Sequence, residues 1–151
     1  MPDPILSQLQ AKTWGYADGD PSALATLGER IAATGKERQL IHYSDLVRGV
    51  TVRLPNVENG TPFELGVPDW RDLDRSILGS FLGRLCVDSY RRGAFLASAL
   101  VTSKGTDEPS EGFWTLVDEL GMLRSRAADK RLLFWIDEVR KAHNWYQANH
   151  W

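Results

Sequence analysis

The sequence has little cysteine and histidine and almost no excess of one charge, and each of these features excludes some possible functions. Cys86 is the single cysteine, so an intrachain disulfide is impossible and the zinc sites that need clustered cysteines are excluded. We expect Cys86 to be an inert core thiol on the apolar face of a helix. The formal net charge is only -2, so tight binding to bare duplex DNA does not follow from net charge.

The motifs of several common chemistries are missing as well. The sequence has no G-x-G-x-x-G, no G-x-S-x-G and no H-E-x-x-H, and its nearest approach to a Walker loop, Gly28 to Lys36, has the wrong spacing. A histidine metal site would need His42, His143 and His150 to converge with carboxylates. We therefore predict no metal site and no cofactor, and we favour a protein that is not an enzyme.

Long apolar runs are also absent. No stretch of about 18 consecutive apolar residues occurs, and Met1 to Gln10 lacks a basic start followed by a long apolar segment. The sequence therefore predicts a cytoplasmic protein without contact to a membrane.

What is present predicts one α+β domain over residues 1–151, mainly helical with a small β-sheet. The apolar share of 42% and the charged share of 25% are ordinary for a globular chain. N-terminal helices are expected over residues 1–38. The pair Asp20-Pro21 favours a helix start, because Asp accepts unpaired N–H groups of the first turn and Pro loses no hydrogen bond there. Apolar spacing extends this helix over residues 21–34, and Gly35 is expected to end it in a left-handed conformation.

Residues 39–121 are expected to form the core. A short helix capped by Ser44 comes first, followed by a strand over residues 50–54. Residues 55–69 are rich in proline and glycine, which indicates a long loop or an irregular hairpin. The rest of the core is a central helix and a buried strand, and a C-terminal helix over residues 127–147 follows it.

The central helix is predicted to open at Asp69 or Asp72 and to end at Gly93. Gly79 and Gly83 lie one turn apart within it, which indicates either close approach of another backbone or simple tolerance of glycine. A buried strand is predicted over residues 95–102, because this stretch is apolar and ends in β-branched residues. A loop over residues 103–112 then leads to a short helix over residues 113–120.

The segment from Leu96 to Trp114 stands out because polar groups gather behind the predicted strand. Lys104, Glu108 and Glu111 follow the strand together with hydroxyls and glycines, and Trp114 lies in the helix after them. Loops held by rigid elements often carry binding or catalytic groups. We therefore take Lys104, Glu108, Glu111 and Trp114 as candidate binding residues.

Three residues from earlier in the chain extend this candidate surface. His42, Tyr43 and Arg53 reach the loop if the helix near them packs beside the predicted strand. The alternative is purely structural: Asp107 and Ser110 cap the next helix, and the charged residues are merely solvated.

Three short stretches carry a resemblance to a known family: His42-Tyr43-Ser44-Asp45-Leu46, Ser98-Ala99-Leu100-Val101 and Glu111-Gly112-Phe113. In this order they resemble the DNA-binding domain of the alkyltransferase and alkyltransferase-like proteins. The resemblance implies a winged-helix-like core and binding to nucleic acid. The family's reactive Pro-Cys-His-Arg segment would fall near Ala97 to Val101, which has neither Cys nor His, so alkyl transfer is not predicted.

The stretch from Ser98 to Trp114 is also similar to a pattern in small uncharacterised bacterial and phage proteins, and no activity follows from that similarity. Three functions stay open. The leading hypothesis is a non-enzymatic interaction module that binds a protein partner or nucleic acid. A metal-dependent nuclease or other hydrolase would use Glu108, Glu111 and Lys104. An immunity or antitoxin protein would present an acidic face to a basic toxin site.

Overall fold

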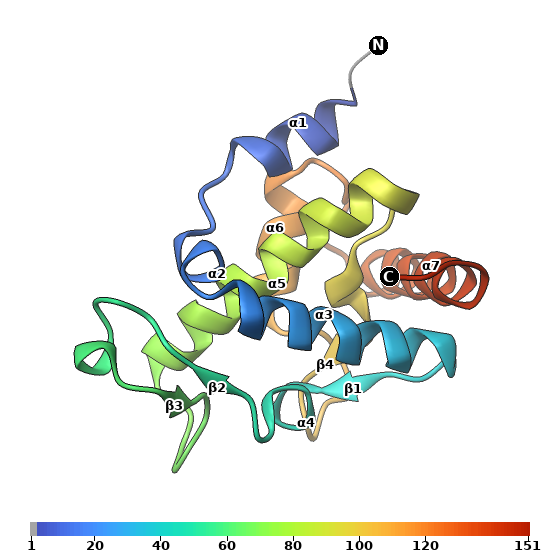
Figure 1. Ribbon diagram of the computed structural model, residues 1–151. Helices are drawn as coiled ribbons and strands as arrows, with labels where there is room; N and C mark the ends of the chain where they lie inside the picture. Colours follow the sequence, from blue (N-terminus) through green and yellow to red (C-terminus); the bar gives the residue numbers. More distant parts are fainter. Residues whose placement is uncertain (1–2) are drawn as a thin grey trace.

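The computed structural model describes residues 3–151, which form a single, mainly helical α+β domain, as predicted (Figure 1). A long helix, α5 (Asp72–Gly93), runs through the middle, and the other helices surround it. These are α1 (Pro4–Ala11), α2 (Gly15–Gly19), α3 (Pro21–Lys36), α4 (Tyr43–Val47), α6 (Glu111–Glu119) and α7 (Ala128–Ala148). The strands are β1 (Ile41–His42), β2 (Thr51–Val52), β3 (Phe63–Glu64) and β4 (Val101–Thr102), and Glu58–Gly60 and Ala97–Leu100 form 3₁₀ turns.

Helix α3 begins where the sequence predicts. The Asp20 carboxylate accepts a hydrogen bond from the Ala23 N–H at 3.0 Å, and Pro21 occupies the first helical position. The expected end at Gly35 is wrong, because the helix continues to Lys36. Gly35 is instead a contact point, since a Cβ placed on it would lie 2.3 Å from the Tyr146 ring of α7.

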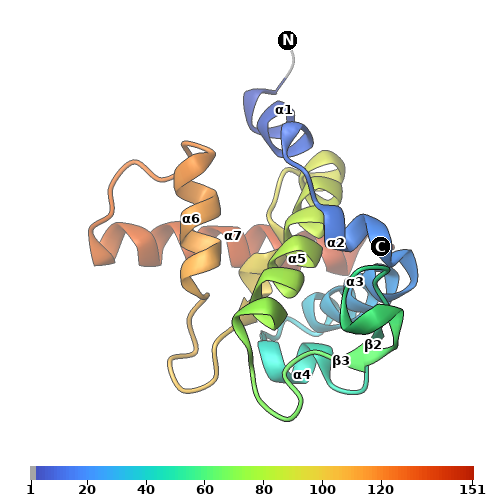
Figure 2. The same ribbon diagram turned by 90° about the vertical axis from the view of Figure 1, so that its left-hand side faces the viewer.

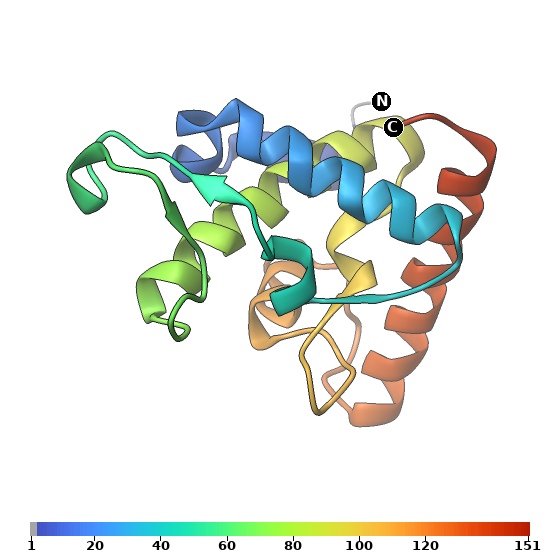
Figure 3. The same ribbon diagram turned by 60° about the horizontal axis from the view of Figure 1, so that its bottom comes forward.

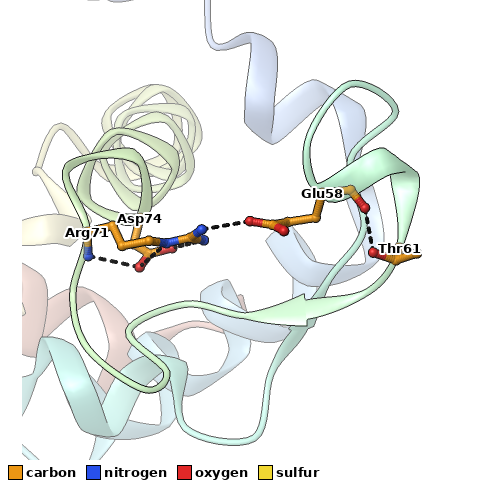
Figure 4. Close-up of polar contacts among 4 residues, drawn as sticks. All are labelled: Glu58, Thr61, Arg71 and Asp74. Carbon is orange, nitrogen blue, oxygen red and sulfur yellow. Dashed lines mark hydrogen bonds and ion pairs between the residues drawn. The ribbon is translucent and has the colours of Figure 1, made fainter.

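Helix α5 begins at Asp72, one of the two predicted starts. Its first turn is held by Asp74, whose carboxylate accepts hydrogen bonds from the backbone N–H and the guanidinium of Arg71. The same guanidinium reaches Glu58 at 2.6 Å, so Arg71 joins the start of α5 to the loop after β2 (Figure 4).

The sheets are two separate pairs of very short strands. β1 and β4 are parallel, with Ile41 opposite Val101, and β2 and β3 are antiparallel, with Thr51 opposite Glu64. The predicted strand at residues 50–54 is confirmed in Thr51–Val52, and the turn-rich stretch after it is an irregular hairpin. The helix expected to be capped by Ser44 begins two residues earlier, at Tyr43, with His42 in the cap position.

The predicted strand over residues 95–102 is largely wrong. All eight residues are buried, but only Val101 and Thr102 pair as a strand, while Ala97–Leu100 form a 3₁₀ turn. Side chains, and not neighbouring strands, accept the hydrogen bonds of the first backbone N–H groups in this stretch. The Leu96 N–H donates to Glu138 of α7 at 3.2 Å, and the Ala97 N–H donates to the Ser89 hydroxyl of α5 at 2.9 Å. Polar side chains from distant helices therefore decide the conformation.

Buried apolar side chains form two clusters on either side of α5. One fills the space between α3, α5 and the C-terminal half of α7, and the other lies between α1, α5, α6 and the N-terminal half of α7. Trp14 and Val139 touch both clusters. Within residues 3–151, no helix is long and apolar enough to cross a membrane.

Candidate functional site

The loop between β4 and α6 is exposed and folds on itself. Residues 104–108 are all exposed. The Ser103 N–H donates to the Glu108 carbonyl at 2.8 Å, and the Asp107 N–H donates to the Ser103 carbonyl at 2.9 Å, which closes a compact turn. Figure 2 shows this loop at the same end of the molecule as α4 and the start of α5.

His42 and Tyr43 anchor the loop, as we expected from the sequence. The parallel pairing of β1 with β4 brings them there, and the His42 Nε2 lies 2.8 Å from the Asp107 carboxylate. Tyr43 does more. Its hydroxyl accepts from the Ser110 N–H and donates to the Ser110 side chain, both at 3.0 Å. One phenol thus fixes the residue that precedes α6.

A groove opens beside this anchor, between α5 and α6. It consists of two adjoining depressions of about 440 and 600 Å³, and both are lined by Tyr43, Gly79, Leu82, Ser110 and Gly112. We call this the α5–α6 groove. A ligand laid along it would contact both α5 and α6.

The two ends of the α5–α6 groove differ. Trp14 and the ion pair between Lys12 and Glu119, at 2.6 Å, border one end. Trp70 and Leu78 line the other end, together with three charged side chains: Lys104, Glu111 and Arg75. No ion pair within residues 3–151 uses Lys104, and its side chain is exposed. That end therefore offers a free cation beside apolar walls.

The structure brings together only part of the predicted site. Tyr43, Lys104 and Glu111 line the α5–α6 groove, and His42 supports it through Asp107. Glu108 is exposed on the loop but does not line the groove.

Trp114 and Arg53 lie elsewhere. The expected surface position of Trp114 is wrong, because its side chain is only 7% exposed and packs with Phe113 in the core under the Arg131 guanidinium. Arg53 does not reach the loop. It belongs to the β2–β3 hairpin, where its Nε donates to the Gly60 carbonyl at 3.1 Å.

Sequence reasoning missed the floor of the groove at Gly79 and the walls formed by Leu82 and Trp14. A Cβ placed on Gly79 meets no atom of residues 3–151 within 4 Å, so this glycine faces open space. Four residues later, a Cβ on Gly83 would lie 2.0 Å from the Trp14 ring. The spacing of Gly79 and Gly83 was the feature of the sequence that could have indicated the groove. Close approach is found at Gly83, although the neighbour is an indole ring and not a backbone.

The residues available for catalysis are few. Among residues 3–151, no three His, Cys, Asp or Glu side chains are grouped so that they could hold a metal ion. Cys86 is fully buried, and burial raises the pKa of its thiol, so the nucleophilic thiolate is disfavoured. Its Sγ lies 3.1 Å from the Ser98 hydroxyl.

Several arginines on α5 and after α6 contact neighbouring side chains. Arg84 and Arg91 both approach Asp88, at 3.5 and 3.2 Å. Arg126 pairs with Asp118, and the Arg92 guanidinium lies 4.4 Å from the Trp151 ring centroid. Neighbouring carboxylates therefore offset the positive charge of Arg84, Arg91 and Arg126.

The arrangement suits binding: it combines a mostly apolar groove, a loop held by hydrogen bonds to His42 and Tyr43, and Lys104, which is unpaired within residues 3–151. Comparison of the chain with protein-family models, curated proteins and solved structures found no match.

Proposed function

We propose that this chain is a non-enzymatic protein-interaction module, and that the α5–α6 groove receives a short segment of a partner protein that carries apolar side chains and a carboxylate. The observation that carries the proposal is the open floor at Gly79 between walls formed by Leu82, Tyr43 and Trp14. A groove lined by aromatic and aliphatic side chains gains binding free energy by removing apolar surface of the ligand from water.

The charged end of the groove supports a carboxylate in the ligand. Among the described residues, 3–151, Lys104 has no acidic partner, and Arg75 beside it pairs only with the fully exposed Asp72, at 3.1 Å. Glu111 lies at the same end and is 3.9 Å from Arg131. Two cations with one partly offset acid favour an acidic residue of the ligand over a basic one.

Nucleic acid fits this surface less well. Binding to a phosphate backbone requires several unpaired cations in a row. Arg84, Arg91 and Arg126 already contact carboxylates, and the formal charge of the chain is -2. These charges favour the protein partner among the partners that the sequence leaves open.

A groove-filling variant tests the proposal. Random short peptides displayed on phage would first be selected against the wild-type protein, and the enriched peptides are expected to combine apolar residues with Asp or Glu. Gly79→Leu should weaken their binding by about tenfold or more, because its side chain fills the groove. Lys104→Glu should weaken the acidic peptides specifically. Binding is measured by fluorescence anisotropy of the labelled peptides.

The matched control is Ser76→Leu, which adds the same side chain to an exposed position of α5 outside the α5–α6 groove. It should leave binding unchanged, and thermal melts should show all three variants folded. Equal binding by wild type and Gly79→Leu would overturn the proposal. Magnesium-dependent cleavage of labelled DNA or RNA that is lost in Glu111→Gln would support the hydrolase alternative instead.

A further inference from the structure

A second surface of the molecule, on α7, is apolar and uncovered. Leu132, Leu133 and Ile136 are 46%, 60% and 42% exposed, and they lie within five consecutive positions of one helix. Helix α7 runs along the outer edge of the molecule, and no other element of the described part of the chain covers its outer side (Figure 3). Exposed apolar side chains that cluster on one helix face are typical of an interaction surface.

The exposure pattern of α7 follows a heptad. Asp129, Leu133, Ile136 and Arg140 are all exposed and are spaced by four, three and four residues, which places them in one stripe along the helix. The side chains on the opposite side face the core of the same molecule, where Glu138 is fully buried. The stripe is therefore the outward seam of α7.

The charges on this seam are complementary to themselves under a two-fold axis. If two copies of α7 run antiparallel with Leu133 opposite Ile136 of the other copy, Asp129 falls opposite Arg140 of the other copy, and the reverse pair forms as well. The flanks agree. Lys130 then lies beside Asp137 of the other copy, so every charged contact along the seam joins opposite signs.

We propose that the outward face of α7 binds a second copy of this chain, and that the two α7 helices pair antiparallel about a two-fold axis between Leu133 and Ile136. A parallel pairing would set Asp129 against Asp129 and Arg140 against Arg140, so like charges exclude it. None of the residues that line the α5–α6 groove lies on α7, so the dimer leaves that groove open.

The length of the seam sets the strength of the dimer. From Asp129 to Arg140 the helix is about 18 Å long. A single helix pair of this length falls near or below the roughly 1,200 Å² of buried surface that separates stable from transient complexes. We therefore expect a dissociation constant in the micromolar range, which rises with salt because the ion pairs are screened.

Sedimentation equilibrium of the whole chain, up to several hundred micromolar, tests this proposal. Wild type should show a concentration-dependent dimer, and Leu133→Glu should be monomeric. Arg140→Asp should weaken the dimer by about tenfold or more, because it places two acids opposite each other twice. The charge exchange Asp129→Arg with Arg140→Asp should restore the dimer, because the antiparallel register pairs the exchanged residues with each other.

The control is Val67→Glu, which puts the same charge at a residue that is 59% exposed, far from α7 in the chain. It should dimerise like wild type, and thermal melts should show every variant folded. A wild type that stays monomeric throughout, or a dimer that Leu133→Glu leaves intact, overturns the proposal. A dimer that Leu133→Glu disrupts but the charge exchange does not restore overturns the antiparallel register.

Discussion

The Tyr146 hydroxyl is buried without a hydrogen-bond partner among residues 3–151, while its ring packs against Phe95, Trp145 and Trp151. Burial raises the pKa of this phenol, so it stays protonated. Phenylalanine keeps the ring and removes the unpaired group. We predict that Tyr146→Phe raises the free energy of unfolding by about 1 kcal/mol, since an unpaired buried polar group costs about 1–3 kcal/mol.

Tyr43→Phe is the matched variant with the opposite sign. Its hydroxyl makes two hydrogen bonds with Ser110, at 3.0 Å each. We expect a loss of about 1–2 kcal/mol in the free energy of unfolding. Urea unfolding of the two variants measures both effects. If Tyr146→Phe costs as much stability as Tyr43→Phe, the hydroxyl of Tyr146 has a partner after all.

At the scale of elements, the attachment of the β2–β3 hairpin to α5 depends on pH through Asp74. Burial alone would raise the pKa of this carboxyl, but the hydrogen bonds from Arg71 outweigh it and lower the pKa below the usual 3.8. Because the folded-state pKa is the lower one, the stabilisation is present in full above pH 3.8 and is lost as the pH falls through the folded value.

We therefore predict that Asp74→Asn destabilises the protein by about 2 kcal/mol at pH 7, since it breaks a charge-assisted contact of a buried group. The deficit should shrink as the pH falls below 3.8, because wild-type Asp74 then becomes protonated too. Urea unfolding at a series of pH values measures this. Asp72→Asn, at an exposed carboxylate two residues earlier, should show a small deficit at every pH. A deficit for Asp74→Asn that does not change with pH would contradict the assignment.

Local chemistry made some elements predictable, and distant partners made others unpredictable. Asp20 and Pro21 start α3 by contacts within one turn, so the sequence was enough. The stretch after Gly93 was predicted as a strand because it is apolar, but its backbone partners are Ser89 and Glu138, and Glu138 lies 42 residues away from Leu96. Periodicity carries no information about such a partner.

The candidate site divides in the same way. Lys104 and Glu111 could be found in the sequence because a short loop separates them. Tyr43 could be found because the helix near it was expected to pack beside the strand that leads into this loop. The groove between α5 and α6 could not be found, since the sequence does not show that the Trp14 ring lies over Gly83 and not over Gly79. That arrangement depends on a contact between residues 69 positions apart in the chain.

For the molecule as a whole, Trp14 is the side chain that connects the parts. It touches both hydrophobic clusters, borders the α5–α6 groove and lies directly on Gly83, while its indole N–H donates to the Leu9 carbonyl at 3.4 Å. A methyl group at position 83 has no room beside this ring. The effect of a substitution at Gly83 on the free energy of unfolding should therefore depend on whether Trp14 is present.

We predict that Gly83→Ala destabilises the wild-type protein but stabilises a variant that lacks the Trp14 ring. In the wild type it should cost about 2–3 kcal/mol of unfolding free energy, because the new Cβ would lie 2.0 Å from the Trp14 ring. In a Trp14→Ala background, itself destabilised by about 3–5 kcal/mol, the same change should stabilise by up to about 1 kcal/mol, since Ala favours a helix over Gly. Urea unfolding of the four proteins gives the coupling. The control is Gly79→Ala, whose new Cβ has no atom of residues 3–151 within 4 Å, and it should stabilise the wild type and the Trp14→Ala variant alike. If Gly83→Ala lowers the free energy of unfolding equally in the wild type and in the Trp14→Ala variant, Trp14 does not lie on α5 in solution.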